Sequence, residues 1–224
     1  MVHAPRVVVH ADELAAADGA ARDIAALVRT ACERRGVAYV AFSGGGVKPM
    51  LDVLCSEDIP WSRVHVYQVD ERVAPDGHPD RNATSLQADL LDKVDVPPTN
   101  VHLLPVTEPD LDAAAAAFGA RLPRFDVLHM GIGEDGHTAS WPPGDPVIEV
   151  RHQPLAVVGP FNGRLRMTIT PGVVAHAHDI VFLVTGASKR DALARVLAGD
   201  PTVPASHVPP DRTVVHCDRA AYSA

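Results

Sequence analysis

The chain of 224 residues is poor in positive charge, with 20 lysine and arginine residues against 28 aspartate and glutamate residues, a formal net charge of −8. Proteins that bind nucleic acid or an anionic membrane surface need a basic face, so no partner of either kind is expected. Only three basic residues are lysines, Lys48, Lys93 and Lys189. An anionic ligand must therefore be held by a few well-placed cations.

Long apolar runs and paired cysteines are also lacking. The first residues hold only a short valine run, 7–9, before Asp12 and Glu13, so no secretory signal is expected. No run approaches the roughly 20 apolar residues of a membrane span. Cysteine occurs three times, an odd number, without the spacing of a metal site. These absences predict a protein of the reducing cytoplasm.

The remaining composition is that of a globular protein, with 46% hydrophobic and 21% charged residues. A chain of this length fits one α/β domain, because such a domain can bury most of its apolar surface. The 20 prolines and 16 glycines are spread along the chain and mark no linker. One domain covering residues 1–224 is therefore expected.

Short valine-rich runs alternate with segments of helical periodicity, which predicts parallel strands joined by crossover helices. The fold class is an α/β protein with an open, mainly parallel, Rossmann-like sheet and helices on both faces. The expected strands are 6–10, 37–42, 64–69, 101–104, 125–130, 155–158, 180–185 and 214–217, and the expected helices are 12–35, 49–55, 84–93, 110–122, 171–177 and 188–198. In such a sheet, ligands bind at the carboxyl ends of the strands.

A glycine run follows the strand 37–42. Gly44, Gly45 and Gly46 allow backbone N–H groups to converge on an anion, and the helix that begins at Pro49 adds a favourable partial charge. Lys48 brings a positive side chain to the same segment. The segment predicts a phosphate cradle, and the alternative is a tight turn from strand to helix.

Two acids and an arginine follow the strand 64–69. The Arg72 guanidinium could make forked hydrogen bonds to phosphate oxygens, and the carboxylates of Asp70 and Glu71 could accept from sugar hydroxyls. The three residues predict a site for a sugar phosphate. The alternative is a solvated charge cluster with local ion pairs.

The loop after strand 125–130 reads Gly-Ile-Gly-Glu-Asp-Gly-His-Thr-Ala-Ser. His137 stands in a glycine-rich turn, and Asp135, two residues earlier, can orient its imidazole. A histidine at a strand end with an adjacent acid is typical of acid–base catalysis. A purely structural histidine is the alternative.

Further cations lie near the end of the chain. Lys189 follows the strand 180–185 in the first turn of a helix, where the helix dipole disfavours a lysine unless an anion binds there. Otherwise it is a surface side chain. Arg166 is another candidate for the anion. His176 and His178 lack a third partner in sequence, so no metal site is predicted.

Together these segments resemble the family that holds the 6-phosphogluconolactonases and the glucosamine-6-phosphate deaminases. The resemblance rests on four stretches in the family's order: Asp-Glu-Arg at 70–72, GIGEDGHTAS at 131–140, RMTIT at 166–170 and VTGASK at 184–189. It implies an open α/β sheet with the active site at its strand ends. It also implies that His137 activates water or acts as acid and base beside Asp135, and that Arg72 and Lys189 contact phosphate.

Two local differences favour the lactonases within this family. Deaminases have tyrosine where this chain has Arg72, and a Phe-Asn-Glu-Pro stretch where it has Ser-Trp-Pro-Pro at 140–143. The resemblance thus implies hydrolysis of a small phosphorylated sugar lactone, 6-phosphoglucono-δ-lactone, by water attack without metal or cofactor. Two alternatives stay open: an isomerase or deaminase of amino-sugar phosphates with Asp70 as base, and a non-catalytic sugar-phosphate sensor. The sensor is considered because the family's SGGSTP is replaced either by SGGGVKP at 43–49, with one extra residue, or by GGGVKP at 44–49 without a gap.

Overall fold

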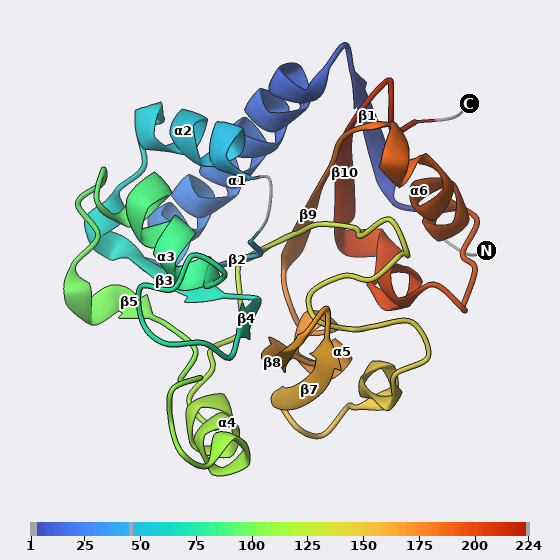
Figure 1. Ribbon diagram of the computed structural model, residues 1–224. Helices are drawn as coiled ribbons and strands as arrows, with labels where there is room; N and C mark the ends of the chain where they lie inside the picture. The colour runs from blue at the N-terminus through green and yellow to red at the C-terminus, as the bar shows by residue number, and fades with distance from the viewer. Residues whose placement is uncertain (1–3, 45–46, 223–224) are drawn as a thin grey trace.

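A sheet of seven parallel strands forms the centre of the computed structural model, which describes residues 4–44 and 47–222 (Figure 1). Every neighbouring pair of strands in this sheet is parallel. In spatial order the strands are β1 (Arg6–His10), β10 (Thr213–Asp218), β9 (Asp179–Val184), β6 (Val127–Met130), β2 (Ala38–Phe42), β3 (Val64–Gln68) and β5 (Val101–His102).

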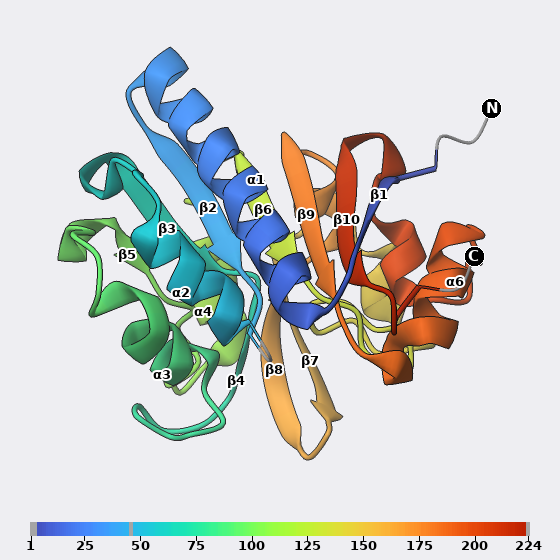
Figure 2. The same cartoon turned by 90° about the horizontal axis from the view of Figure 1, so that it is seen from above.

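Helices cover both faces of this sheet, as the sequence predicts. Because strand side chains alternate in direction, Val127 and Val181 pack into one apolar cluster, and Leu128 and Phe182 pack into the other. Figure 2 shows α1 lying across one face with α2 beside it. The helices on this face are α1 (Glu13–Arg35), α2 (Lys48–Ser56) and α3 (Asn82–Leu86); α4 (Leu111–Gly119), α5 (Pro171–Val174) and α6 (Arg190–Leu197) belong to the other.

Local capping residues explain the ends of the long helix α1. The Asp12 side chain accepts a hydrogen bond from the Ala15 N–H at 2.9 Å, which satisfies one free donor of the first turn. At the other end, Gly36 has a φ of 79°, a left-handed conformation that glycine adopts without a steric penalty. The helix predicted over 12–35 is therefore confirmed almost to the residue.

A second sheet of three antiparallel strands was not predicted, and its strand β4 (Asp70–Arg72) follows directly after the carboxyl end of β3. The sheet consists of β4, β8 (Arg164–Ile169) and β7 (Leu155–Phe161). The strand expected at 155–158 thus forms, but outside the parallel sheet, and β8 was not expected as a strand. Val69 joins the two sheets, because its N–H donates to the Phe42 carbonyl and its carbonyl accepts from the Ile169 N–H. These pairings join distant parts of the chain, which local periodicity does not show.

Other segments differ from the prediction at their ends. Residues 84–93 form α3 and then a π turn, Gln87–Leu91, and the helix expected at 171–177 is the single turn α5. The helix expected at 188–198 begins with a 3₁₀ turn, Ala187–Lys189. Among the described helices, none has the length and apolar character needed to cross a bilayer.

The order of the strands reverses next to β2. The chain passes from β2 outward to β3 and β5, and then returns to β6 on the other side of β2. The loops that follow β2 and β6 therefore diverge, and in open α/β sheets the crevice between two such loops is where ligands bind. These two loops are the glycine run and the segment with His137.

Candidate active site

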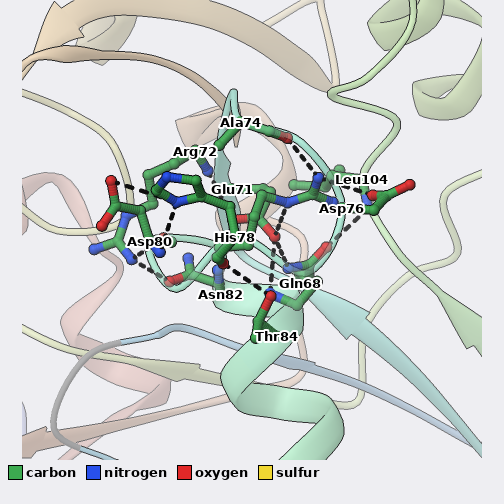
Figure 3. Close-up of polar contacts among 12 residues, drawn as sticks. Gln68, Glu71, Arg72, Ala74, Asp76, His78, Asp80, Asn82, Thr84 and Leu104 are labelled. Carbon is green, nitrogen blue, oxygen red and sulfur yellow. Dashed lines mark hydrogen bonds and ion pairs between the residues drawn. The ribbon is translucent and has the colours of Figure 1, made fainter.

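Glu71 organises one side of this crevice, and its carboxylate is fully buried among donors (Figure 3). It accepts hydrogen bonds of 2.7–2.8 Å from the Gln68 amide and from the backbone N–H groups of Arg72, Asn82 and Ala83. The buried Arg81 guanidinium completes the group with an ion pair of 3.0 Å. Because Asn82 and Ala83 begin α3, Glu71 caps that helix and ties it to β4. Its oxygens therefore support the site rather than face the crevice.

Asn82 links three candidate site residues. Its Nδ2 donates to the Asp70 carbonyl at 2.8 Å, and its Oδ1 accepts from Arg72 Nη1 at 2.7 Å. A Cβ at Gly44 would lie 1.9 Å from the same Oδ1, so only glycine lets the loop backbone approach Asn82 this closely. Sequence reasoning missed Asn82, although its place beside Arg81, in the turn that follows Asp-Glu-Arg, was visible.

Asp70 is a buried carboxyl at the start of β4. Its Oδ2 accepts a hydrogen bond from Ser140 Oγ at 2.5 Å and lies 3.8 Å from Arg166 Nη1. Burial raises the pKa of this carboxyl, against the hydrogen bond from Ser140 and the positive charges of Arg72 and Arg166. Ser140 was not predicted as a site residue, because only the fold brings it to Asp70.

Arg166 connects this buried group to His137. Its guanidinium lies 4.9 Å from the centroid of the Phe161 ring and donates to the Phe161 carbonyl at 3.2 Å. The edge of that ring in turn meets the imidazole of His137, with centroids 5.0 Å apart. Burial, followed by the nearby charge of Arg72, lowers the pKa of Arg166, which still remains protonated at neutral pH. Phe161, at the end of β7, was also missed from the sequence.

His137 is held by Asp135 in a glycine-rich turn. Its Nδ1 lies 2.5 Å from Asp135 Oδ1, and its backbone N–H donates to the same oxygen. A Cβ at Gly133 would lie 2.0 Å from Nδ1, so the turn needs glycine there. Burial opposes ionisation of Asp135, but the hydrogen bonds from His137 outweigh it and keep the pKa of the carboxyl below its ordinary value. An ionised carboxylate can only accept, so Nδ1 carries a proton, and in the neutral imidazole Nε2 presents a lone pair.

Lys189 stands at the end of the neighbouring strand β9. The turn before it requires Gly186, with a φ of 90°, whose N–H donates to the Asp218 carboxylate at 3.1 Å. Lys189 is half-buried, and its ammonium makes no hydrogen bond or ion pair with another described residue. Since β9 pairs with β6, Lys189 and His137 follow adjacent strands at the same edge of the sheet.

Lys48 and the glycine run were predicted to form a phosphate cradle after β2. Lys48, in the first turn of α2, forms an ion pair of 2.7 Å with Asp52 and lies 3.7 Å from Asp89. Its ammonium thus links α2 to the segment after α3, and its predicted contact with substrate stays a prediction. Gly45 and Gly46 lie outside the described residues.

The arrangement supplies the elements of acyl transfer to water. One imidazole with a fixed tautomer can accept a proton from water. Arg72 and Arg166 lie opposite each other in the second sheet, and Lys189 follows β9 at the same sheet edge as His137. A base for the attacking water and positive charges for an anionic substrate are therefore both present at this edge of the sheet. Within the described ranges, no three His, Cys, Asp or Glu side chains converge as metal ligands would.

Comparison of the sequence with known proteins places it in a family. The model of a family described as glucosamine-6-phosphate isomerases/6-phosphogluconolactonase matches residues 11–217. The 6-phosphogluconolactonase of Synechocystis sp. is 36% identical over 183 residues, 76% of either chain. That of Streptomyces coelicolor is 34% identical over 222 residues, which cover 89% of this chain and 85% of the relative.

Solved structures share the fold across the family. The 6-phosphogluconolactonase of Thermotoga maritima superposes with a TM-score of 0.86 at 23% identity, over 96% of this chain and 99% of that one. A monomeric glucosamine-6-phosphate deaminase gives a TM-score of 0.84 at 18% identity, over 96% and 98%. The fold is therefore common to proteins named for both activities. The chain belongs to the glucosamine-6-phosphate isomerase/6-phosphogluconolactonase family.

Proposed function

We propose that this protein hydrolyses 6-phosphoglucono-δ-lactone to 6-phosphogluconate. The single observation that carries the proposal is the His137–Asp135 pair at the carboxyl edge of the sheet, with the Phe161 ring in contact with both His137 and the Arg166 guanidinium. The curated relatives named 6-phosphogluconolactonase, at 34–36% identity, support the same reaction. A lactone is an ester, and its hydrolysis needs a base beside the attacking water, stabilisation of the developing oxyanion and an anchor for the phosphate.

In this proposal, His137 Nε2 takes a proton from the attacking water while its Nδ1–H stays bonded to Asp135. The water oxygen adds to the lactone carbonyl, and the bond from that carbon to the ring oxygen then breaks. The imidazolium returns its proton to the departing ring oxygen, which becomes the hydroxyl of the product. Asp135 stabilises the imidazolium that forms between the two steps.

Arg72, Arg166 and Lys189 are the proposed phosphate contacts. Arg72 is fixed by its bonds to Asn82 and the Asp80 carbonyl, and Lys189 keeps a free ammonium among the described residues. Asp70 stays in the proposal as an acceptor for substrate hydroxyls, and Gly44 as a source of backbone contact. Lys48 is given no direct phosphate contact in this proposal, because its ammonium pairs with Asp52 and lies 3.7 Å from Asp89.

We further propose that residues 1–224 work as one sugar-phosphate hydrolase domain in the cytoplasm. The candidate site draws on residues from Gly44 to Lys189, so it needs both sheets together. The three cysteines are unpaired, as is usual in a reducing compartment.

The test follows acid release from lactone generated freshly by oxidation of glucose 6-phosphate, in weak buffer with a pH indicator. The protein should accelerate acid release well above the spontaneous rate, and heat-inactivated protein should not. Unphosphorylated δ-gluconolactone should react far more slowly, because it lacks the phosphate anchor. Ammonia release from glucosamine 6-phosphate without lactone hydrolysis would instead identify a deaminase, and binding without turnover of either would identify a sensor.

A further inference from the structure

A cationic groove lies at the opposite edge of the parallel sheet from the candidate active site. Arg124 precedes β6, His176 precedes β9 and Arg212 precedes β10, so all three stand at the amino ends of strands. The candidate active site follows the carboxyl ends of β6 and β9. A six-residue strand such as β9 spans roughly 20 Å, which separates the two places.

The groove has a volume of about 500 Å³, within the range of small-molecule sites. Three arginines from separate segments line it, Arg124, Arg151 and Arg212, together with His152 and His176. None of its described lining residues is an aspartate or a glutamate. In a chain with a net charge of −8, this local excess of positive charge needs a reason.

The guanidinium groups are held by backbone carbonyls rather than by acids. Arg124 Nε donates to the His176 carbonyl at 2.7 Å, and Arg151 Nη1 donates to the Ile148 carbonyl at 2.6 Å. Arg212 Nη1 donates to the carbonyls of Ala175 and Ala177, at 3.0 and 3.1 Å. The nearest acid is Asp211, with Oδ2 3.7 Å from Arg212 Nε.

These contacts fix the arginines without using up their donors. A guanidinium has five N–H donors, and carbonyls neutralise none of its charge. Both terminal nitrogens of Arg124, and Nη2 of Arg151 and Arg212, make no hydrogen bond to another described residue. The groove therefore presents forked donors of the kind that bind phosphate oxygens in pairs.

We propose that this groove is a second binding site, for a small phosphorylated molecule. Its phosphate would lie among Arg124, Arg151 and Arg212, and its carbon atoms would pack on the apolar part of the lining, Leu122 and Val173. The adjoining cavity beside β7 shares His152, Gln153 and Pro154 with the groove and is lined by the acids Asp112 and Asp145 instead of arginines. This site is independent of the proposed lactonase reaction.

The test is a titration of ¹⁵N-labelled protein with inorganic phosphate at constant ionic strength, followed by NMR. Amide signals of residues 151–153 and 172–176 should shift and saturate. Arg151→Gln should weaken this binding about tenfold, which corresponds to about 1.4 kcal/mol, because it removes one charged contact to the phosphate. The same variant should leave lactone hydrolysis unchanged, because Arg151 is remote from His137.

The matched control is Arg22→Gln, which removes an exposed arginine of α1 whose partner is Asp18. It should leave phosphate binding in the groove unchanged. Arg212→Gln is the second groove variant, with its thermal unfolding recorded, because it also loses bonds to two carbonyls. The proposal is overturned if the groove signals do not move, if chloride moves them equally, or if Arg22→Gln weakens binding as much as Arg151→Gln.

Discussion

The two sides of the candidate active site differ in how completely their polar groups are paired. One side, called the buried cluster, consists of Asp70, Glu71, Arg81 and Asn82. These residues are buried and joined to one another by hydrogen bonds or ion pairs. The other side, the open rim, consists of Asp135, His137 and Lys189. There the His137 side chain is 27% exposed, and its Nε2 has no partner among the described residues.

This contrast separates the residues that hold the site from those that react. A buried carboxylate such as Glu71 is tolerated only when donors surround it, so removing one partner leaves another charge buried without compensation. A partly exposed side chain loses little on substitution, because water replaces its contacts. Substitutions in the buried cluster should therefore mainly lower stability. Substitutions in the open rim should lower activity at nearly constant stability.

The largest effect is expected at the rim. His137→Asn should lower kcat/KM for the phosphorylated lactone by about 10²- to 10⁴-fold, the usual contribution of a positioned base. The free energy of unfolding should change little, because the side chain is part-exposed. Steady-state acid release and urea denaturation of the same preparation measure both quantities. An unchanged rate with an intact fold would remove His137 from the mechanism.

The next largest effect, on stability, is expected in the buried cluster. Glu71→Gln should lower the free energy of unfolding by about 3 kcal/mol or more, because it leaves the buried Arg81 without its buried charged partner. Asp76→Asn is the matched control: Asp76 is the other acid bound to Arg81, but its side chain is 84% exposed. That change should cost no more than about 1 kcal/mol. If urea denaturation shows equal losses in the free energy of unfolding for both variants, the distinction between the buried cluster and the open rim is wrong.

Acid should lower the stability of the protein through a buried histidine of the parallel sheet. His129 in β6 is fully buried, neither ring nitrogen has a partner in the described structure, and burial lowers its pKa to about 4. The unfolded chain, with an ordinary value near 6.5, then binds more protons between these two pH values. From this group alone, stability should fall by about 3 kcal/mol as the pH drops from 7 to 4.

The variant His129→Leu isolates that contribution. It replaces the titrating imidazole with an apolar side chain next to Phe42. As the pH falls from 7 to 4, its free energy of unfolding should decrease less than that of the wild type. The free energy of each protein at pH 7 serves as its reference. Parallel pH profiles for both proteins would show that His129 does not titrate as described.

The smallest effects should distinguish the cations. Arg72→Ala and Lys189→Ala should each raise KM for the phosphorylated lactone by about tenfold or somewhat more, since each removes a charged contact. Lys48→Ala should change KM less than about threefold, because its ammonium pairs with Asp52. Rates with unphosphorylated δ-gluconolactone provide the control. If that substrate is impaired equally, Arg72 and Lys189 do not anchor phosphate.

Much of the fold could be predicted from the sequence because its signals are local. The period of the valine-rich runs and the cap of α1 at Asp12 depend on residues close together in the chain. The second sheet could not be predicted, because β4 pairs with β8, far along the sequence. Asn82, Ser140 and Phe161 were missed for the same reason: each reaches the site only through contacts that folding creates.

By itself, the sequence determined the fold class, the order of the loops and the residues His137 and Asp135, which are only two positions apart and meet within one turn. Only the tertiary structure distinguishes the surroundings of Lys48 and Lys189, which look alike in the sequence as lysines near glycines where a helix begins. Asp52 and Asp89 lie beside the first, and no acid of the described chain pairs with the second. Charge pairing depends on distances in space, so the chain's low positive charge became informative only once the neighbours of each lysine were known.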